Sequence, residues 1–339
     1  MQVFTTTPFD DIAAAGELFA ELEACGYDGA FSYETKHDPF LPLALASRTT
    51  TRLRLGTAIA IAFARTPMTL ANVGHDLAHL SDGRFTLGLG TQVRPHIERR
   101  YSMPWSRPAA RMRELVLGIR AIWDAWDGIA PLHFEGEFYR HTLMTPAFDP
   151  GPHRVPRARL HVAAVGPRLT EVAAEVGDGV IVHPFSTRRS LLELTLPAVA
   201  RGLATAGRDR ADLEVIVVCL LATGATGAEL DRSVEVVRKQ LAFYASTPAY
   251  ARVLEVHGWD GLHPQLNRLS KEGRWDDMAE LVPDELIEAV AVVGRRDEVP
   301  GLVREKLAGV ADTVSIECTR QPDPAHFADI VAGLGGGGR

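Results

Sequence analysis

An acid, a base and an aromatic residue lie close together in the segment Glu34-Thr35-Lys36-His37-Asp38-Pro39-Phe40. A histidine beside a carboxylate can donate or accept a proton near neutral pH. The alternative is that Asp38 caps the helix that follows, while His37 bonds to a neighbouring loop. Because the segment directly follows a predicted strand, we favour His37 and Asp38 as candidates for the catalytic acid/base group.

Two glycine-containing turns are candidates for binding a ligand. The first, Gly88-Leu89-Gly90-Thr91-Gln92-Val93, lacks the third glycine of a dinucleotide fingerprint, but its missing side chains would let a flat ring approach the backbone. The second, Val165-Gly166-Pro167-Arg168, joins a strand to a helix whose free amides can bind an anion, and Arg168 could add a charge. A tight strand-to-helix turn and a proline at the first helical position are the structural alternatives.

A metal site is not indicated by the sequence. His75 and His79 lie four residues apart on one predicted helix, but the glutamate that a zinc-protease helix requires is missing. The three cysteines are too widely spaced for a disulfide framework or a zinc site. We therefore predict no metal and a reduced, cytoplasmic protein.

Strands and helices alternate along the chain. Apolar runs bounded by turns predict eight strands, and amphipathic segments between them predict helices. The strands are expected at Gln2–Thr6, Asp28–Tyr33, Leu53–Ala62, Arg84–Leu89, Arg159–Val165, Gly179–His183, Leu213–Ala222 and Thr313–Glu317. Eight strands, each paired with a helix, favour a closed α/β fold, the (β/α)8 TIM barrel, over an open doubly wound sheet. In such a barrel, active sites lie at the carboxyl ends of the strands.

The helices between these strands are expected at Asp10–Cys25, Leu41–Thr50, Pro67–Leu80, Leu169–Val176, Leu191–Ala206 and Glu298–Ala308. A plain barrel needs roughly 250 residues, so this chain of 339 must carry insertions, and they fall after strands four and seven. The first would combine a helix at Arg107–Trp126 with a hairpin at His133–Leu143. The second, Thr223–Val293, would contain a helix at Ala228–Tyr244 and a loop rich in Trp and Gly around Gly258–Asp277. Residues 1–330 form the predicted barrel, and residues 331–339 a flexible Gly-rich tail.

Composition excludes several partners. Lys and Arg number 36 against 43 Asp and Glu, a net charge of −7, without a basic run that would favour nucleic acid. The apolar stretches are too short to span a bilayer, and the start of the chain lacks the pattern of a signal peptide. We expect a protein that contacts neither nucleic acid nor a membrane and that acts on a small molecule.

Four motifs, taken in order, carry a resemblance to a known family. They are Gly26-Tyr27-Asp28-Gly29 leading to Glu34–Phe40, Leu55-Gly56-Thr57-Ala58-Ile59-Ala60-Ile61-Ala62-Phe63-Ala64-Arg65-Thr66-Pro67, Leu80-Ser81-Asp82-Gly83-Arg84-Phe85 leading to Leu87-Gly88-Leu89-Gly90, and Gly177-Asp178-Gly179-Val180. Over nearly its whole length the chain resembles the bacterial luciferase-like flavin and deazaflavin oxidoreductases. In detail it is similar to the branch that uses coenzyme F420, a deazaflavin that carries hydride at C5. Residues 92–108 resemble one actinobacterial subgroup of that branch.

The resemblance implies roles by position. It implies a non-prolyl cis peptide at Ala58–Ile59 behind the deazaflavin ring, and an acid/base group beside the ring at His37 or Asp38. The other cofactor contacts that it implies are Gly90 and Thr91 along the ring, Val165, Gly166, Pro167 and Arg168 at the phosphate of the tail, and His183 facing the same cavity.

Two departures from the family pattern concern the substrate. Members that act on sugar phosphates carry an acid on strand one, where this chain reads Thr5-Thr6-Thr7, and a glutamate after strand four, where it has Val93. The substrate is therefore left as an unidentified organic molecule.

The sequence thus predicts an F420-dependent oxidoreductase. The alternatives are an FMN-dependent monooxygenase that takes reduced flavin from a separate reductase, and a non-catalytic barrel that only binds the cofactor. A homodimer is expected, because barrels of this family commonly pair and the helix Pro67–Leu80 carries more apolar residues than a solvated helix requires.

Overall fold

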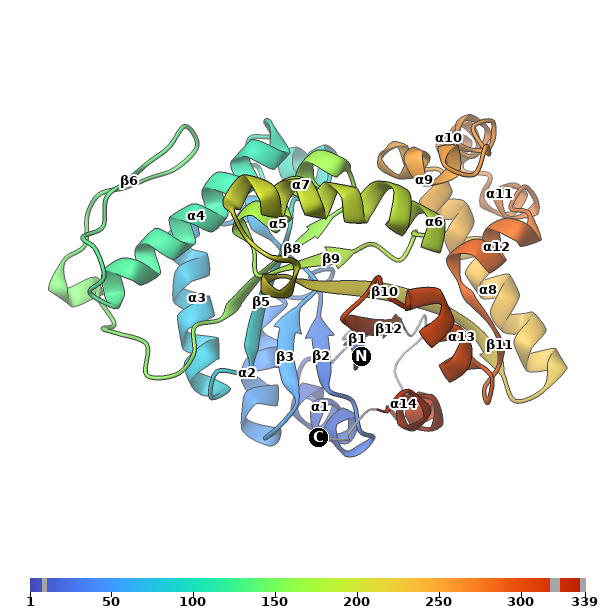
Figure 1. The fold of residues 1–339 in the computed structure, drawn as a ribbon, viewed down its shortest axis with the longest axis horizontal. Helices are drawn as coiled ribbons and strands as arrows, with labels where there is room; N and C mark the ends of the chain where they lie inside the picture. Colours follow the sequence, from blue (N-terminus) through green and yellow to red (C-terminus); the bar gives the residue numbers. More distant parts are fainter. Residues whose placement is uncertain (8–10, 318–323, 336–339) are drawn as a thin grey trace.

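A computed structural model describes residues 1–7, 11–317 and 324–335. In these ranges eight parallel strands close into the predicted barrel, in the order β1-β2-β3-β5-β8-β9-β10-β12, with β12 returning to β1 (Figure 1). The strands of the barrel are β1 (Gln2–Thr7), β2 (Gly29–Ser32), β3 (Arg54–Thr57) with its continuation β4 (Ala60–Ile61), β5 (Phe85–Gly90), β8 (Arg159–Ala164), β9 (Gly179–Val182), β10 (Glu214–Gly224) and β12 (Thr313–Glu317).

Helices cover the outside of the barrel. Side chains on the outer faces of the strands form one large hydrophobic cluster with these helices. The ring contains α1 (Ala15–Ala24), α2 (Phe40–Thr49), α3 (Pro67–Leu80), α4 (Pro108–Trp126), α5 (Pro167–Val176), the short α6 (Arg188–Ser190) with α7 (Leu196–Ala206), α13 (Val299–Leu307) and α14 (Ala328–Leu334). Of these helices, α1, α2, α3, α4, α5 and α7 pack in succession, as do α13 and α14.

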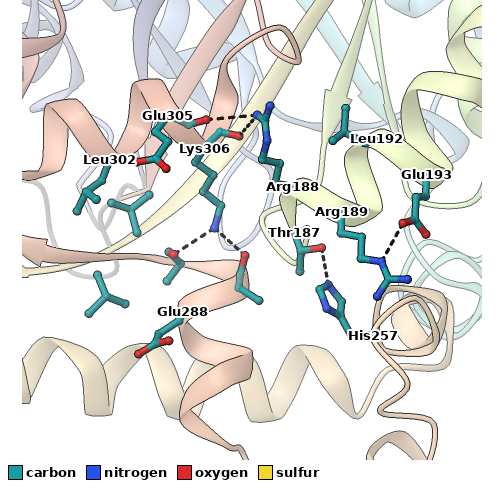
Figure 2. Close-up of a pocket in the computed structure, with 14 residues that line it drawn as sticks. Thr187, Arg188, Arg189, Leu192, Glu193, His257, Glu288, Leu302, Glu305 and Lys306 are labelled. Atoms are coloured by element: carbon teal, nitrogen blue, oxygen red, sulfur yellow. Dashed lines mark hydrogen bonds and ion pairs between the residues drawn. The ribbon is translucent and has the colours of Figure 1, made fainter.

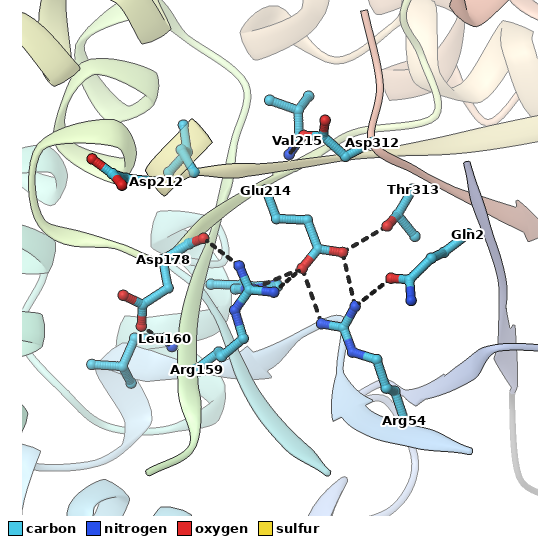
Figure 3. Close-up of polar contacts among 12 residues, drawn as sticks. Gln2, Arg54, Arg159, Leu160, Asp178, Asp212, Glu214, Val215, Asp312 and Thr313 are labelled. Atoms are coloured by element: carbon cyan, nitrogen blue, oxygen red, sulfur yellow. Dashed lines mark hydrogen bonds and ion pairs between the residues drawn. The ribbon is translucent and has the colours of Figure 1, made fainter. Parts of the chain in front are cut away.

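The barrel interior has a polar floor at the amino ends of the strands. Glu214, the first residue of β10, is 7% exposed and accepts hydrogen bonds from Arg54 (2.9 and 3.1 Å), Arg159 (2.5 Å) and Thr313 (2.6 Å) (Figure 3). These three partners are the first residues of β3, β8 and β12. One carboxylate therefore joins four strands at one end of the barrel.

Above this floor the interior is apolar. Phe4, Phe31, Ile181, Ile216 and Val218 point inward from four strands and form a cluster separate from the outer one. Because side chains alternate along a strand, the next residues of each strand that point inward lie at its carboxyl end, above this inner cluster. The interior is thus filled up to the level where a barrel enzyme places its site.

The third strand differs from its expected form. The predicted continuous strand Leu53–Ala62 is divided into β3 and β4 by a cis peptide bond between Ala58 and Ile59. The cis bond that the family resemblance implied is therefore present.

The first insertion matches its prediction. It contains α4 and an antiparallel hairpin of β6 (Phe134–Glu135) and β7 (Arg140–His141), which projects at the left of Figure 1. In the second insertion α8 (Gly227–Ala245) also matches, and α9 (Ala251–Glu255) and α12 (Asp284–Val290) complete a separate group of helices (Figure 1). These helices and the upper end of β10 share a second hydrophobic core.

One prediction for this second insertion is wrong, and one strand was not predicted. The expected loop around Gly258–Asp277 contains α10 (Leu262–Glu272) and α11 (Trp275–Glu280). Leu266 and Leu269 of α10 are buried in the second core, which supplies the apolar partner that an amphipathic helix needs. A further strand, β11 (Val292–Arg295), was not expected and pairs with the part of β10 that extends beyond the barrel.

The two ends of the chain also differ from the prediction. Helix α1 begins at Ala15, and the expected helix start at Asp10 lies outside the described residues. Helix α14 continues to Leu334, with Val331 and Leu334 buried in the main core, so residues 331–334 belong to a packed helix. Residues 336–339 of the predicted tail lie outside the described part. Within the described ranges, no helix is long and apolar enough to cross a membrane.

Candidate active site

The mouth of the barrel, at the carboxyl ends of the strands, brings most of the predicted site residues together. The cis peptide follows β3, Gly90 ends β5, and His183 follows β9. The segment from Glu34 to Asp38 follows β2. Since these strands are neighbours in one closed sheet, residues distant in sequence meet at this face.

The cis peptide is held from both sides by the end of β2. The amide of Ala58 donates to the carbonyl of Ser32 (2.8 Å), and the amide of Glu34 donates to the carbonyl of Ile59 (3.0 Å). The carboxylate of Glu34 also accepts a hydrogen bond from the amide of Ile61 (2.7 Å). Hydrogen bonds on both sides fix this part of the backbone as a platform.

Gly90 lies against the same platform. A β-carbon at this position would stand 2.7 Å from the side chain of Ile59, closer than real contacts allow. The structure therefore brings Ala58, Ile59 and Gly90 into one surface. Thr91 follows directly, and the chain then turns at Gln92, whose φ of 58° is left-handed and uncommon for a residue other than glycine.

Asp38 makes contacts that give it a structural role. Its Oδ1 accepts from the amide of Phe40 (2.9 Å) at the start of α2, and its Oδ2 accepts from Arg65 (2.9 Å). Arg65 also bonds to the buried Glu34 (2.7 Å), whose second oxygen accepts from the hydroxyl of Tyr101 (3.0 Å). Burial and the negative charge of Glu34 raise the pKa of Tyr101.

His37 is half-buried next to this network. Arg65 and Tyr101 were not among the predicted site residues. Arg65 lies within the third-strand motif, but only the folded chain shows that it joins Glu34 to Asp38.

A narrow pocket lies at the start of α5, where a phosphate site was predicted. Val165, Pro167, His183 and Ser186 line it, and Gly166 is the N-cap residue of α5, with no side chain to occupy the free amides. Arg168 is exposed on the first turn of α5 and does not line this pocket. The basic residue that does line it is Arg252, from α9 in the second insertion, which sequence reasoning missed because it is 84 positions from Arg168.

His183 is neutral and fixed in orientation. Its ring stacks on Tyr250, with centroids 4.2 Å apart, and meets the edge of Tyr244 at 4.8 Å. Burial lowers the pKa of His183 to about 3. The amide of Phe185 donates to Nδ1 (3.1 Å), so the ring hydrogen of this neutral histidine is on Nε2. His183 can therefore donate a hydrogen bond, but it does not supply a charge.

A buried carboxyl at the end of β12 was also missed. Glu317 has one hydrogen-bond partner among the described residues, the amide of Gln240 at 3.4 Å, and Gln240 also donates to Tyr244 (2.8 Å). Glu317 Oε2 and Gln240 Oε1 are buried without a partner in the described part of the chain. Burial raises the pKa of Glu317 to about 7, although the bond from Gln240 lowers it slightly. The alternation of Thr313, Ser315 and Glu317 along the strand was the signal that could have identified it.

A wide cavity of about 930 Å³ lies away from the mouth, between α6, α12, β11 and α13 (Figure 2). Two of its basic side chains bind the carbonyl ends of helices: Arg188 those of α13 (2.8 Å to Lys306), and Lys306 those of α12 (2.6 Å to Val290). His257 is bonded to Thr187 (2.8 Å). Because these polar groups are engaged in holding the fold, the barrel mouth is the better candidate for chemistry.

Comparisons with known proteins identify the family of the chain. A family model described as luciferase-like monooxygenase matches residues 1–315. An uncharacterized protein of Mycobacterium tuberculosis is 53% identical over 305 residues, which cover 90% of each chain. A protein of the same species, named as a coenzyme F420-dependent oxidoreductase, is 31% identical over 301 residues and 84% of each chain.

Solved structures show the same fold. The coenzyme F420-dependent tetrahydromethanopterin reductase of Methanopyrus kandleri has a TM-score of 0.80 at 22% identity, over 97% of this chain and 96% of that one. The oxygenating constituent of 3,6-diketocamphane monooxygenase from Pseudomonas putida, solved with FMN, has a TM-score of 0.66 at 16% identity, over 98% and 97%. Together with the family match over residues 1–315, the sequence relatives establish that this chain belongs to the luciferase-like monooxygenase family.

Proposed function

We propose that the protein is an oxidoreductase that transfers hydride between coenzyme F420 and a small organic substrate. The observation that carries the proposal is the platform of Ala58, Ile59 and Gly90, where a side chain at residue 90 would fill the surface that a flat ring needs. The sequence relative named for coenzyme F420 supports this choice of cofactor. When bound, the deazaflavin would supply the hydride at its C5.

The residues present fit such a cofactor at both of its ends. Ala58, Ile59, Gly90 and Thr91 would hold the ring. The start of α5, with Gly166 as its N-cap and the amides of its first turn, would take the phosphate, since helix N-termini attract anions. Arg252 would add a positive charge, and Arg168 is the alternative source of that charge.

The chain's own groups would then position the substrate and move protons. His37 is the proposed acid/base group beside the ring, and Asp38, whose two oxygens accept from Phe40 and Arg65, is the alternative. His183 would donate a hydrogen bond from Nε2, and the rings of Tyr244 and Tyr250 that contact it would exclude water. Positioning and exclusion of water are the main contributions of a protein to cofactor chemistry.

A second candidate function is an FMN-dependent monooxygenase supplied with reduced flavin by a separate reductase. The monooxygenase description of the family and the neighbour solved with FMN favour it. The same platform and phosphate pocket would serve FMN. A barrel that only binds the cofactor is the third alternative, and turnover of any redox substrate would exclude it.

Titration of the purified protein with F420 and with FMN, followed by absorbance and fluorescence, tests the proposal. We expect tighter binding of F420, and tighter binding of FMN would favour the monooxygenase. Arg252→Ala should weaken binding of the preferred cofactor about tenfold, the value of one charge-assisted hydrogen bond. Arg168→Ala tests the alternative source of this charge, and it should leave the affinity nearly unchanged if Arg252 supplies the charge. If neither cofactor binds the wild-type protein, the proposed function is wrong.

We also propose that the protein is a homodimer. Most apolar residues of α3 are buried within its own chain, so they do not argue for pairing, but Leu41 and Leu45 of the neighbouring α2 are 57% and 44% exposed. Light scattering should give twice the chain mass of 36.9 kDa. The monomer mass at micromolar concentration would contradict the dimer.

A further inference from the structure

Glu317 occupies the highest inward position of β12. Two residues below it, the Oγ of Ser315 lies 3.0 Å from the Oγ1 of Thr6 inside the barrel, and two residues further down Thr313 bonds to Glu214 in the floor. Val314 and Ile316, between them, belong to the outer cluster. Because side chains alternate along a strand, Glu317 must point into the barrel mouth.

The groups that face Glu317 include no cation among the described residues. Its register neighbours are Thr6 on β1 and Leu220 on β10. From α8 it faces Gln240 and Tyr244. Tyr244 also interacts electrostatically with the hydroxyls of Tyr250 and of Tyr33, the residue that follows β2. Burial raises the pKa of Tyr244, so this tyrosine is neutral as well. Among the described residues, the titratable groups that border Glu317 therefore supply no charge to balance a carboxylate.

The hydrogen bonds of Glu317 suit a protonated carboxyl better than an ion. A buried carboxylate needs several donors, whereas this one has a single donor at 3.4 Å. Its Oε2 is buried without a partner in the described part of the chain, as is Gln240 Oε1. Burial accordingly raises the pKa of Glu317 to about 7, so the group can both hold and release a proton near neutral pH.

We propose that Glu317 is a further catalytic residue, the buried acid that delivers the proton accompanying hydride transfer to the substrate. This inference rests on the proposed function, which supplies the reductant as the reduced deazaflavin. As hydride adds to an electron-poor carbon of a C=O, C=N or conjugated C=C group, the electron pair of that bond moves to the far atom. That atom takes the proton as the O–H bond of Glu317 breaks. The carboxylate left behind is reprotonated from water, so atoms and electrons balance.

Glu317 differs in this respect from Asp38. Both oxygens of Asp38 accept hydrogen bonds within the protein, whereas Oε2 of Glu317 has none among the described residues. Glu317 would therefore approach the substrate from the β12 side of the mouth. Glu34, Arg65 and Asp38 would hold the platform of Ala58, Ile59 and Gly90 in place.

Infrared difference spectroscopy of the whole protein tests the inference without a known substrate. The spectrum of wild type minus Glu317→Gln at pH 6 should show the C=O stretch of a protonated carboxyl, and this band should fade as the pH rises through about 7. Glu285→Gln, at an exposed position of α12, is the control and should show no such band. Glu317→Gln is close in shape to the wild type, and measurement of its melting temperature checks that it folds. Absence of the band at pH 6 overturns the proposal.

Addition of the cofactor separates this inference from the proposed function. If F420 or FMN binds and the Glu317 band shifts, the carboxyl borders the ring, as proposed. If a cofactor binds and the band does not move, Glu317 is a structural acid and the inference fails while the function stands. If neither cofactor binds, the proposed function fails and the inference falls with it, although the band of the free protein is still observed.

Turnover gives the second readout. With any ketone, enone or imine that the wild type reduces at the expense of reduced F420, Glu317→Gln should lower kcat by roughly 10²–10⁴-fold, the usual value of general acid catalysis. Cofactor affinity should not change, and the pH dependence of kcat near 7 should disappear. An unchanged kcat overturns the assignment.

Discussion

Asp38 illustrates how one side chain supports two interpretations. Its bond to the amide of Phe40 and its ion pair with Arg65 explain its presence without any catalytic role. Its neighbour His37 is half-buried, and no contact within the described part explains its position in the same way. At the scale of residues, the acid/base assignment is therefore best tested by separating the two.

Three substitutions provide that separation. Asp38→Asn keeps an acceptor for the amide of Phe40, whereas Asp38→Ala loses both contacts and should lower the free energy of unfolding by about 1 kcal/mol. If His37 moves a proton, His37→Ala should leave cofactor affinity within a few-fold and lower turnover by roughly 10²–10⁴-fold. Melting temperature, affinity and rate are measured on the same preparations. Full turnover in His37→Ala and Asp38→Asn would exclude both residues as the acid/base group.

At the scale of elements, the end of β5 depends on glycine for two different reasons. A β-carbon at Gly88 would lie 1.8 Å from the backbone oxygen of Thr57, which cannot move without breaking the sheet. At Gly90 the obstacle is the side chain of Ile59, which can rotate. At Gly166, no other part of the described protein lies within 4 Å of the β-carbon position.

These differences predict a graded series of alanine variants. Gly88→Ala should be destabilised by 3 kcal/mol or more, at or above the upper end of the roughly 1–3 kcal/mol that overpacking costs. Gly90→Ala should fold with a smaller loss but bind the cofactor poorly, since Ile59 is displaced from the platform. Gly166→Ala should keep nearly full stability. Thermal melts and cofactor titrations check the order, and normal cofactor binding by Gly90→Ala would show that the platform does not hold the ring.

The elements that could be predicted from sequence are those with a strong local pattern. The apolar strands and their helices follow from periodicity and length, so the barrel and its two insertions are recovered. Helix α10 was missed because Gly258, Gly261 and Gly273 surround it, and its few leucines become an apolar face only when the second core covers them. Arg252 was missed for a related reason, because it reaches the site only through the folding of the second insertion. Glu317 was missed although the alternation of polar residues along its strand indicated that it points inward.

At the scale of the whole molecule, the floor of the barrel should make stability dependent on acid. Burial alone would raise the pKa of Glu214, but the hydrogen bonds and charge of Arg54 outweigh it and lower the pKa to about 2. A carboxylate with a lowered pKa stabilises the fold above its unfolded value of 4.5, and this contribution is lost as the pH falls towards 2. Burial lowers the pKa of His161 to about 3, so the unfolded chain takes up its proton first and stability also falls below pH 6.5.

Glu214→Gln tests this account. The variant should lose about 3 kcal/mol at pH 7, the lower end for breaking a buried ion pair, because the partly buried Arg54 loses its carboxylate while the exposed Arg159 can turn to solvent. Between pH 4.5 and 2 its stability should fall less steeply than that of the wild type, in which about 3 kcal/mol depends on this one group. Urea unfolding at several pH values gives both quantities. Parallel curves for the two proteins would show that Glu214 does not carry the acid dependence.

The length of β10 has a consequence for how ligands enter and leave. Its eleven residues, from Glu214 in the floor to Gly224, are all buried. The helices of the second insertion pack on Leu220 and Ala222 of this strand. These helices therefore rest on a strand whose first half is hydrogen-bonded to β9 and β12. They cannot move away from the mouth without disturbing the barrel sheet. The chain from Gln92 to Arg107 contains no strand and is held by side-chain contacts instead, such as the buried Ile97 in the main core and the bond of Tyr101 to Glu34. We expect cofactor and substrate to enter and leave the barrel mouth beside residues 92–107, while the helices of the second insertion stay in place.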